Sequence, residues 1–391
     1  MPRAMTGTLL FDGTGGAPRP SQTVVWEAGR IEWVGADGDA DLTGADPVVD
    51  AHGAAVLPGL IDAHVHLCFD ATVEGIEGVA AEPMGAVRAR SMRAARILLG
   101  AGITSARDQG SREGVAVEVA RAQRAGEIPG ARILASGRGL TPTGGHGWMI
   151  GVEADGPEAI RAAVAEEIRR GADVIKLFPT GGVLGSGAHG FEVVMTVQDV
   201  RAAVEEAHRH GRLVGAHVHG PPGIDIVLEA GVDTIEHATG ITEEQARRAA
   251  AAGVVLVPTL AALDAMIEHG AGIPDDLMER AREIREVAAT GIRTAISAGT
   301  TVLAGTDAGT PFNPPGLLVR EMQLLADLGL GNLGAIRAAT SASADALRLD
   351  GLGRIDPGAI ADLMLVAGDP SVDLAVLAHP GLVVQDGEFV V

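Results

Sequence analysis

Six side chains of types that bind metal ions are spaced so that they could meet at one place. His64 and His66 stand two residues apart in an apolar run, so both imidazoles would point to the same face of a β-strand. The other candidates each lie at or near the end of a later apolar run: Lys176, His217, His237 and Asp307. Nitrogen and oxygen ligands of these types suit two divalent first-row ions. The spacing therefore predicts a metal centre formed by the four histidines, the lysine and the aspartate.

Lys176 is the only lysine in the chain: of the 30 Lys and Arg residues, the other 29 are arginines. It lies in the apolar run 173–178, where an unpaired ammonium would be costly to bury. A desolvated lysine, unlike arginine, can lose its proton and form covalent adducts. Addition of CO2 would give a carbamate whose two oxygens could bridge cations about 3.5 to 4 Å apart. The alternative is an ordinary lysine that extends from a strand end into solvent.

The elements that would position these residues alternate between strands and helices. Apolar runs predict eight strands, at 60–66, 103–108, 132–136, 174–178, 213–218, 234–237, 254–258 and 302–307. Apolar spacings of three and four residues predict helices between them, including 82–99, 157–170, 197–210, 242–251 and 275–298. Eight such units closing on themselves form a TIM-type (β/α)8 barrel, whose reactive side chains lie at the carboxyl ends of the strands.

Both ends of the chain are rich in β-like runs. Short runs at 23–26 and 30–34 precede the predicted barrel, and runs at 361–366 and 382–391 follow it. We therefore predict an α/β fold in which residues 1–56 and 352–391 form one small β-sandwich. Residues 57–351 would form the barrel with the predicted metal centre.

Composition favours a small-molecule enzyme. The chain has 391 residues, of which 47% are hydrophobic, and a formal net charge of −21. Such a charge would repel a phosphate backbone or an anionic membrane surface, so neither nucleic acid nor membrane is an expected partner. Cys68 is the sole cysteine, which excludes an internal disulfide or a thiolate cluster. The N-terminal residues show no signal-like apolar core, so the expected location is cytoplasmic.

Three motifs resemble the amidohydrolase superfamily of metal-dependent hydrolases. They are Pro58-Gly59-Leu60-Ile61-Asp62-Ala63-His64-Val65-His66, Gly305-Thr306-Asp307-Ala308-Gly309 and Pro357-Gly358-Ala359-Ile360-Ala361-Asp362-Leu363. Two further segments, Val174-Ile175-Lys176 and Thr143-Gly144-Gly145-His146-Gly147, are similar to its prolidase and imidazolonepropionase-like branch. The better-known members of that branch are dipeptidases, including Xaa-Pro dipeptidases, and zinc carboxypeptidases.

The resemblance implies a role for each candidate. His64, His66 and Asp307 would hold the more buried zinc, His217 and His237 the more exposed one, and carbamylated Lys176 would bridge the two. A hydroxide between the metals would attack the scissile carbonyl, with Asp307 as general base and then proton donor to the departing nitrogen. His146 would contact the oxyanion or a substrate carboxylate.

Two positions depart from the pattern of related dipeptidases. His219 stands where they often have a tyrosine, and it could still hydrogen-bond a substrate carboxylate or the oxyanion. Pro315 stands where relatives commonly have a histidine, so a side-chain contact is lost there. A specialised substrate is therefore expected.

Several functions remain open at this stage. The first is hydrolysis of an amide bond in a dipeptide or N-acyl amino acid, and the second is opening of a cyclic amide or cleavage of a carbamate or urea. A mononuclear deaminase is disfavoured, because such sites usually have a glutamate where this chain has Gly220. A non-catalytic scaffold or binding protein should have lost some ligands, whereas all six are present.

The remaining features of the chain carry weaker expectations. His189 is a weak candidate site residue, and no function is assigned to His52, His208, His210, His269 or His379. The barrel helices could support a homo-oligomer, but no interface is indicated.

Overall fold

A computed structural model describes residues 1–182, 191–270 and 275–390, with the side chains of 275–277 excepted. The chain divides into two compact units. The first comprises Met1–Asp62, Ile97–Ser105 and Gly316–Val391, and the second comprises Ala63–Arg96 and Ala106–Pro315. Within the described part of the chain, the search for a helix long and apolar enough to cross a bilayer found none.

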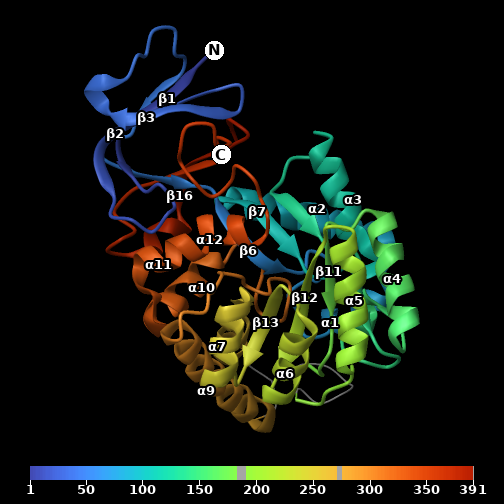
Figure 1. The fold of residues 1–391 in the computed structure, drawn as a ribbon. Coiled ribbons are helices and arrows are strands. Elements are labelled where there is room, and N and C mark those ends of the chain that lie inside the picture. The colour runs from blue at the N-terminus through green and yellow to red at the C-terminus, as the bar shows by residue number, and fades with distance from the viewer. Residues whose placement is uncertain (183–190, 271–274, 391) are drawn as a thin grey trace. The chain divides into compact units, whose positions relative to one another are not determined.

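The first unit is built on a mixed eight-stranded sheet that joins both ends of the chain (Figure 1). Its strands are β1 (Arg3–Leu10), β2 (Arg19–Glu27), β3 (Arg30–Ala36), β4 (Val48–Asp50), β5 (Ala55–Pro58), β15 (Leu363–Val366), β16 (Pro380–Gln385) and β17 (Glu388–Phe389). The strand order is β17-β16-β15-β5-β1-β2-β3, with β4 beside β1. The indole of buried Trp26 donates a hydrogen bond to the Gly387 carbonyl at 2.9 Å, so the two ends of the chain also share a core. Three helices complete this unit: α10 (Leu318–Leu325), α11 (Gly331–Ala338) and α12 (Ser341–Ala346).

The second unit holds a parallel sheet with helices beside it. The strands β9 (Gly139–Thr141), β10 (Gly151–Glu153), β11 (Val174–Leu177), β12 (Leu213–His219), β13 (Thr234–Thr239) and β14 (Val255–Val257) pair in the order β10-β9-β11-β12-β13-β14. Figure 1 shows the helices α4 (Pro157–Arg170), α5 (Val197–Arg209) and α6 (Pro221–Ala230) along the same side of β11, β12 and β13. Further helices are α2 (Met84–Gly100), most of which lies in this unit, α3 (Val115–Arg124), α7 (Glu243–Ala252), α8 (Leu260–His269) and α9 (Asp275–Ser297).

Local sequence explains where these helices begin and end. Thr196 caps α5 and Thr242 caps α7, each in a capping box with the residue three positions later. Helices α4, α6 and α7 end at glycines in the left-handed conformation, which a residue without a side chain adopts without strain. These signals lie in the sequence itself, and the predicted helices 157–170 and 197–210 agree with the structure to within one residue.

A separate three-stranded sheet has the order β6 (Leu60–Val65), β7 (Ile103–Asp108) and β8 (Arg132–Ala135). Backbone hydrogen bonds extend beyond it, because Asp173 N donates to Ala135 O at 2.8 Å and Ala63 N donates to Ala304 O at 2.9 Å. The predicted α/β class is confirmed, and the first seven predicted strands each coincide with a strand of the structure.

The eighth predicted strand, 302–307, is not a regular strand. Val302 forms only an isolated parallel bridge to Leu256, although Leu303 N donates to Leu256 O at 2.9 Å. Asp307 has a φ of 59°, in the left-handed region, which ends any extended run. The segment therefore hydrogen-bonds on both sides without the continuous ladder of a strand.

Replacement of Gly59 by alanine should destabilise the first unit. A Cβ at Gly59 would lie 2.3 Å from the Thr104 hydroxyl oxygen, so the buried backbone would have to shift. We expect a loss of about 1–3 kcal/mol in the free energy of unfolding, as for other overpacked sites. Gly38→Ala is the matched control, because nothing lies within 4 Å of a Cβ there. Equal chemical denaturation curves for both variants would contradict this account of Gly59.

Candidate metal centre

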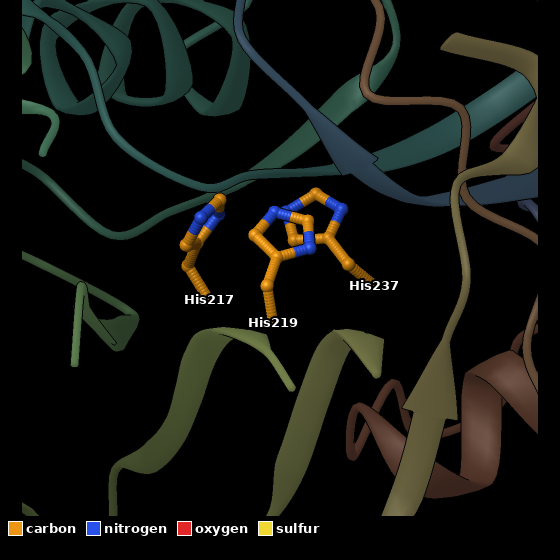
Figure 2. Close-up of side chains that lie close together, drawn as sticks. All are labelled: His217, His219 and His237. Carbon is orange, nitrogen blue, oxygen red and sulfur yellow. The ribbon is translucent and has the colours of Figure 1, made fainter. Parts of the chain in front are cut away.

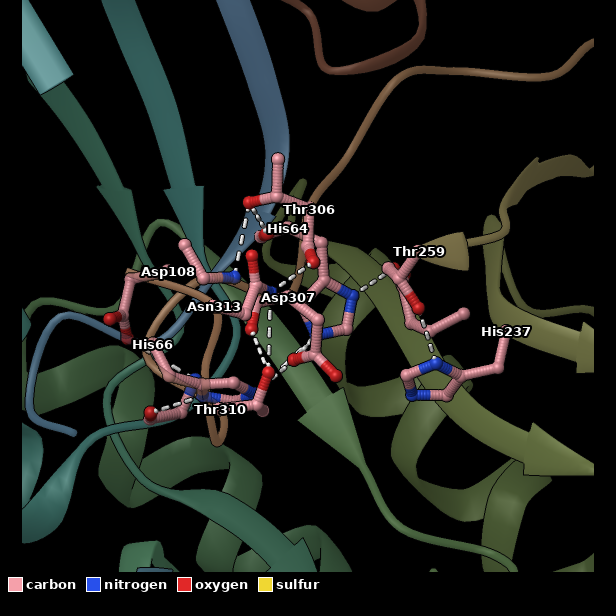
Figure 3. Close-up of polar contacts among 12 residues, drawn as sticks. His64, His66, Asp108, His237, Thr259, Thr306, Asp307, Thr310 and Asn313 are labelled. Atoms are coloured by element: carbon pink, nitrogen blue, oxygen red, sulfur yellow. Dashed lines mark hydrogen bonds and ion pairs between the residues drawn. The ribbon is translucent and has the colours of Figure 1, made fainter. Parts of the chain in front are cut away.

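His64, His66 and Asp307 come together at the end of β6. Figure 3 shows their side chains facing one another. The Nε2 atoms of the two histidines lie 3.4 Å apart, and each lies 3.3 Å from the Asp307 Oδ1. All three residues are thus placed to offer one atom each to a shared ion.

The spacing of these three atoms fits a metal ion. Zinc binds histidine nitrogen at about 2.0–2.1 Å in tetrahedral sites, which puts neighbouring ligand atoms about 3.3–3.4 Å apart. The three observed separations of 3.3, 3.3 and 3.4 Å match this edge length. The arrangement therefore suits a tetrahedral cation with one open position.

A second group contains three histidines. Possible ligand atoms of His217, His219 and His237 all lie within 4.8 Å of one another. Figure 2 shows their three rings close together, with His217 and His219 rising from β12 and His237 from β13. The ring centroids of His217 and His237 lie 4.4 Å apart, and those of His219 and His237 lie 4.9 Å apart in a stacked pair. The structure thus brings His219 into the same cluster as the two predicted ligands.

Hydrogen bonds on the outer ring nitrogens orient the first pair of histidines. The Nδ1 atom of His64 lies 2.8 Å from a carboxylate oxygen of Glu236, and the Nδ1 atom of His66 lies 2.8 Å from the Gly110 carbonyl oxygen. Both partners are acceptors, so Nδ1 carries the proton in each ring and the Nε2 lone pair faces the centre. This is the usual second-layer support of a metal-binding histidine.

The second group is held in the same way. Nε2 of His217 lies 3.2 Å from the Gly181 carbonyl oxygen, which leaves Nδ1 free to bind an ion. Nδ1 of His219 contacts the Thr239 hydroxyl at 2.9 Å, and Nδ1 of His237 contacts the Thr259 hydroxyl at 2.7 Å. Each ring in the cluster therefore has one nitrogen fixed by the protein and one directed elsewhere.

Lys176 lies on β11 with its side chain fully buried. Its Nζ atom has no hydrogen-bond partner within the described residues, although a buried ammonium without one is costly. Burial is the main reason that the pKa of Lys176 falls to about 8. A lysine whose Nζ is bonded to a further group would show this lack of a partner in a structure of the protein alone.

The strand register explains why Lys176 and His217 share a face. Lys176 pairs with Gly215 on the neighbouring strand, and His217 lies two positions further along, so both side chains point to the same side. His217 in turn pairs with Glu236 on β13. Gly215 leaves room for the Glu236 side chain, since a Cβ at Gly215 would lie 2.8 Å from a Glu236 carboxylate oxygen.

His237 reaches the same site through an irregular backbone. In a regular strand Glu236 and His237 would point to opposite faces. The pairing of β12 with β13 shifts register after Val218, and His237 has a φ of 67°. Such a bulge re-aims a side chain, at a cost of order 1–3 kcal/mol for a left-handed non-glycine residue. Thr259 and Asp307 also have positive φ values, so three residues of this site have strained backbones.

The Asp307 turn is fixed by its own hydrogen bonds, drawn in Figure 3. The Thr310 hydroxyl donates to the Asp307 carbonyl at 2.7 Å, and the Asn313 side-chain amide donates to the Thr306 carbonyl at 2.7 Å. The Asp307 N–H donates to the His64 carbonyl at 2.8 Å. These bonds hold the carboxylate beside the His64 and His66 rings.

A buried ion pair beneath the site was not predicted from the sequence. Arg107 donates to both carboxylate oxygens of Glu236, at 2.9 and 3.0 Å, and also to the Ala63 carbonyl and the Thr234 hydroxyl. Burial would raise the pKa of Glu236, but Arg107 and the His64 hydrogen bond together lower it well below its ordinary value. A possible signal was present, because opposite charges stand in two runs predicted to be buried, where each needs a partner.

The electrostatics of the cluster favour neutral imidazoles. Burial, with repulsion from neighbouring charged groups, lowers the pKa values of His217 and His237 well below the ordinary value. Burial likewise lowers the pKa of His219 to about 3. Burial acts to raise the pKa of Asp307, but His64 and His66 lower it by more, so its pKa lies well below the ordinary value. Neutral imidazoles and an ionised carboxylate are the forms that bind metal ions.

His146 lies at the edge of the second group. Its ring centroid is 4.5 Å from that of His217, and burial lowers its pKa to about 4. Gly182 allows this approach, because a Cβ there would lie 2.2 Å from the His146 ring. His189, the weaker candidate, lies outside the described residues, and the predicted ligands and His146 all fall in the second unit.

A cavity of about 100 Å³ opens beside both groups. His66, His146, His217, His219, His237 and Asp307 contribute to its wall. Mostly apolar residues complete the lining. The candidate ligands thus face a space that can admit a small molecule.

Comparison with known proteins assigns the chain to a family. Residues 55–390 match the model of the Amidohydrolase family. Ochratoxinase from Aspergillus niger is 30% identical over 95% of this chain and 82% of its own length, and imidazolonepropionase from Salinispora tropica is 29% identical over 97% and 93%. The crystal structure of a prolidase complexed with N-methylphosphonate-L-proline superposes with a TM-score of 0.92 at 31% identity, covering 100% of this chain and 99% of the other. The predicted family resemblance is therefore confirmed, and this chain belongs to the amidohydrolase family.

Proposed function

We propose that this chain is a binuclear metal-dependent hydrolase of a carbon–nitrogen bond in a small amide. The observation that carries the proposal is the matched spacing of the His64, His66 and Asp307 ligand atoms, 3.3 to 3.4 Å apart beside a cavity. The names of its relatives support the same reaction class, since they include a prolidase and an ochratoxinase. Dipeptides and N-acyl amino acids are the first candidate substrates, and cyclic amides, carbamates and ureas are the alternative.

We assign the ligands in two sets joined by one lysine. His64, His66 and Asp307 would hold one zinc ion, and His217 and His237 the other, with Lys176 as a carbamate between them. The unpartnered Nζ of Lys176 supports this assignment. The neutral amine would add to CO2 with loss of one proton, which turns a costly buried ammonium into an anion that can bind both ions.

The bound ions would lower the pKa of a water molecule and polarise the scissile carbonyl. Asp307 would orient that water, accept its proton and return the proton to the departing nitrogen. His146 and His219, at the cavity wall, would donate hydrogen bonds to the developing oxyanion or to the substrate. Glu236 would act through His64, by holding that ring in one tautomer and orientation.

We also propose that the predicted barrel strands form a closed (β/α)8 barrel. The hydrogen bonds from Asp173 to Ala135, from Leu303 to Leu256 and from Ala63 to Ala304 support closure, because they link the two parallel sheets on both sides. The division into a barrel of residues 57–351 and a β-sandwich of 1–56 with 352–391 remains a prediction.

Metal analysis with substrate profiling tests the proposed function. We expect two zinc-like ions per chain in protein purified without chelators, hydrolysis of amide-type substrates, loss of activity on chelation and recovery on adding Zn²⁺. The assay measures release of the amine from dipeptides, N-acyl amino acids, cyclic amides, carbamates and ureas. Full activity with fewer than two ions per chain would overturn the binuclear assignment.

Lys176→Arg should lose bound metal and lower activity by at least about a hundredfold, because arginine cannot form the carbamate. Lys176→Ala should regain part of both when short carboxylic acids are added. Labelling with ¹³C-bicarbonate gives a second readout, since the carbamate signal should be present in the wild type and absent from both variants. A metal-replete, active arginine variant would refute the bridging role.

Glu236→Gln should weaken metal binding about 10- to 100-fold, because Arg107 loses its buried counter-charge and His64 loses the carboxylate that fixes its tautomer. Glu167→Gln is the matched control: Glu167 is also buried and accepts from Arg138 at 2.8 Å, but its ion pairs are with Arg138 and Arg170 and not with a candidate metal ligand. Zinc affinity is measured by chelator competition, and stability by thermal denaturation of the metal-free proteins. Equal zinc affinities in both variants would remove Glu236 from the metal centre.

A further inference from the structure

The lining of the cavity beside the candidate ligands contains both polar and apolar side chains. The polar residues include the histidines and Asp307. The apolar residues include Ile76, Met149 and Ile150, together with Leu263, Met266 and Ala288 from α8 and α9. We call these six residues the apolar wall. Apolar surface that faces a concave space favours an apolar ligand, since binding removes that surface from water.

The apolar wall is continuous with well-packed structure. Met149 and Ile150 belong to a buried cluster with Phe69 and Phe178, and Ile76 packs against it. On the other side, α8 begins directly after Thr259, whose hydroxyl contacts His237. The wall is thus held at a fixed position relative to the candidate ligands.

No fixed positive charge lines the cavity in the part of the chain that the structure describes. Its lining residues include neither arginine nor lysine, and Asp307 is their only carboxylate. The two internal segments outside the description, 183–190 and 271–274, also contain no arginine or lysine in the sequence. Lys176 is fully buried and is not among the lining residues.

Recognition of a substrate carboxylate usually relies on such a cation. A charged group buried against the apolar wall would lose its hydration without gaining a partner. The net charge of −21 adds a general repulsion of anions. Loss of hydration acts against either charged end of a free dipeptide, and the net charge acts against its carboxylate.

We propose that the substrate presents an uncharged alkyl or aryl group to the apolar wall, so that neutral amides, carbamates or ureas are preferred over zwitterionic dipeptides. This inference rests on the proposed hydrolysis of a carbon–nitrogen bond. It narrows the substrate class of the same site. It also assigns the choice between neutral and charged substrates to residues that are not candidate metal ligands.

A matched set of 4-nitroanilides tests the proposal. The hexanoyl, glutaryl and 5-aminopentanoyl derivatives have the same leaving group and chains of similar length, which end in a methyl, a carboxylate and an ammonium group. We expect kcat/KM for the hexanoyl compound to exceed that for either charged compound by at least about tenfold. Values within threefold of one another, or a preference for a charged compound, would overturn the proposal.

A variant with a positive charge in the apolar wall gives a second, independent test. Leu263→Arg places a guanidinium on the partly exposed part of the wall and should raise the glutaryl-to-hexanoyl ratio of kcat/KM by about tenfold. Val287→Arg is the matched control, because Val287 is exposed on α9 and does not line the cavity. An unchanged ratio in a Leu263→Arg protein that retains its metal would count against the wall as the selecting surface.

The outcomes separate this inference from the proposed function. Hydrolysis of charged dipeptides at rates equal to neutral amides would refute the apolar preference and leave carbon–nitrogen hydrolysis standing. No hydrolysis of any amide, carbamate or urea by metal-replete protein would refute the proposed function itself.

Discussion

The ion pair between Arg107 and Glu236 is the interaction on which the arrangement of the candidate metal centre depends. Both side chains are fully buried, and each is costly to hold without the other. Glu236 also accepts from the outer nitrogen of His64, while Arg107 donates to the carbonyl of Ala63, next to His64 in the chain. One ionic contact therefore ties strands β6, β7 and β13 to the orientation of a single imidazole. Its value lies in positioning, since buried ion pairs often contribute little net stability.

Backbone strain is the second constraint at this site. His237, Thr259 and Asp307 all adopt left-handed conformations, which non-glycine residues rarely do. Two of these positions are connected, because the Thr259 hydroxyl contacts His237, and the Asp307 turn is held by a hydrogen bond from Thr310. The surrounding packing must supply the free energy for this strain, and the result is that side chains from irregular strand ends converge on one point.

In the proposed function, the histidines and Asp307 carry the reaction and the apolar wall selects the substrate. The ligand geometry is compatible with many amide-type substrates, and relatives of this chain carry names as different as ochratoxinase and imidazolonepropionase. We propose that selection among substrates falls to residues such as Leu263 and Met266, which belong to α8 and line the cavity. Because such residues are not among the candidate metal ligands, we expect that they can change without loss of the reaction.

The sequence alone determined the family and the α/β class, and it placed seven of the eight predicted strands. Those features depend on local periodicity, on capping residues and on short motifs such as His64-Val65-His66. Each of these signals is encoded by residues that are close together in the sequence. It also singled out Lys176, whose uniqueness is visible in composition.

Only the tertiary structure revealed that Glu236 pairs with Arg107, that His219 joins the cluster of His217 and His237, and that no cation lines the cavity in the described residues. These facts join segments more than a hundred residues apart, or depend on a register shift and a positive φ that residue types do not encode. A sequence pattern states which side chains are available, whereas their partners are set by which strands lie side by side.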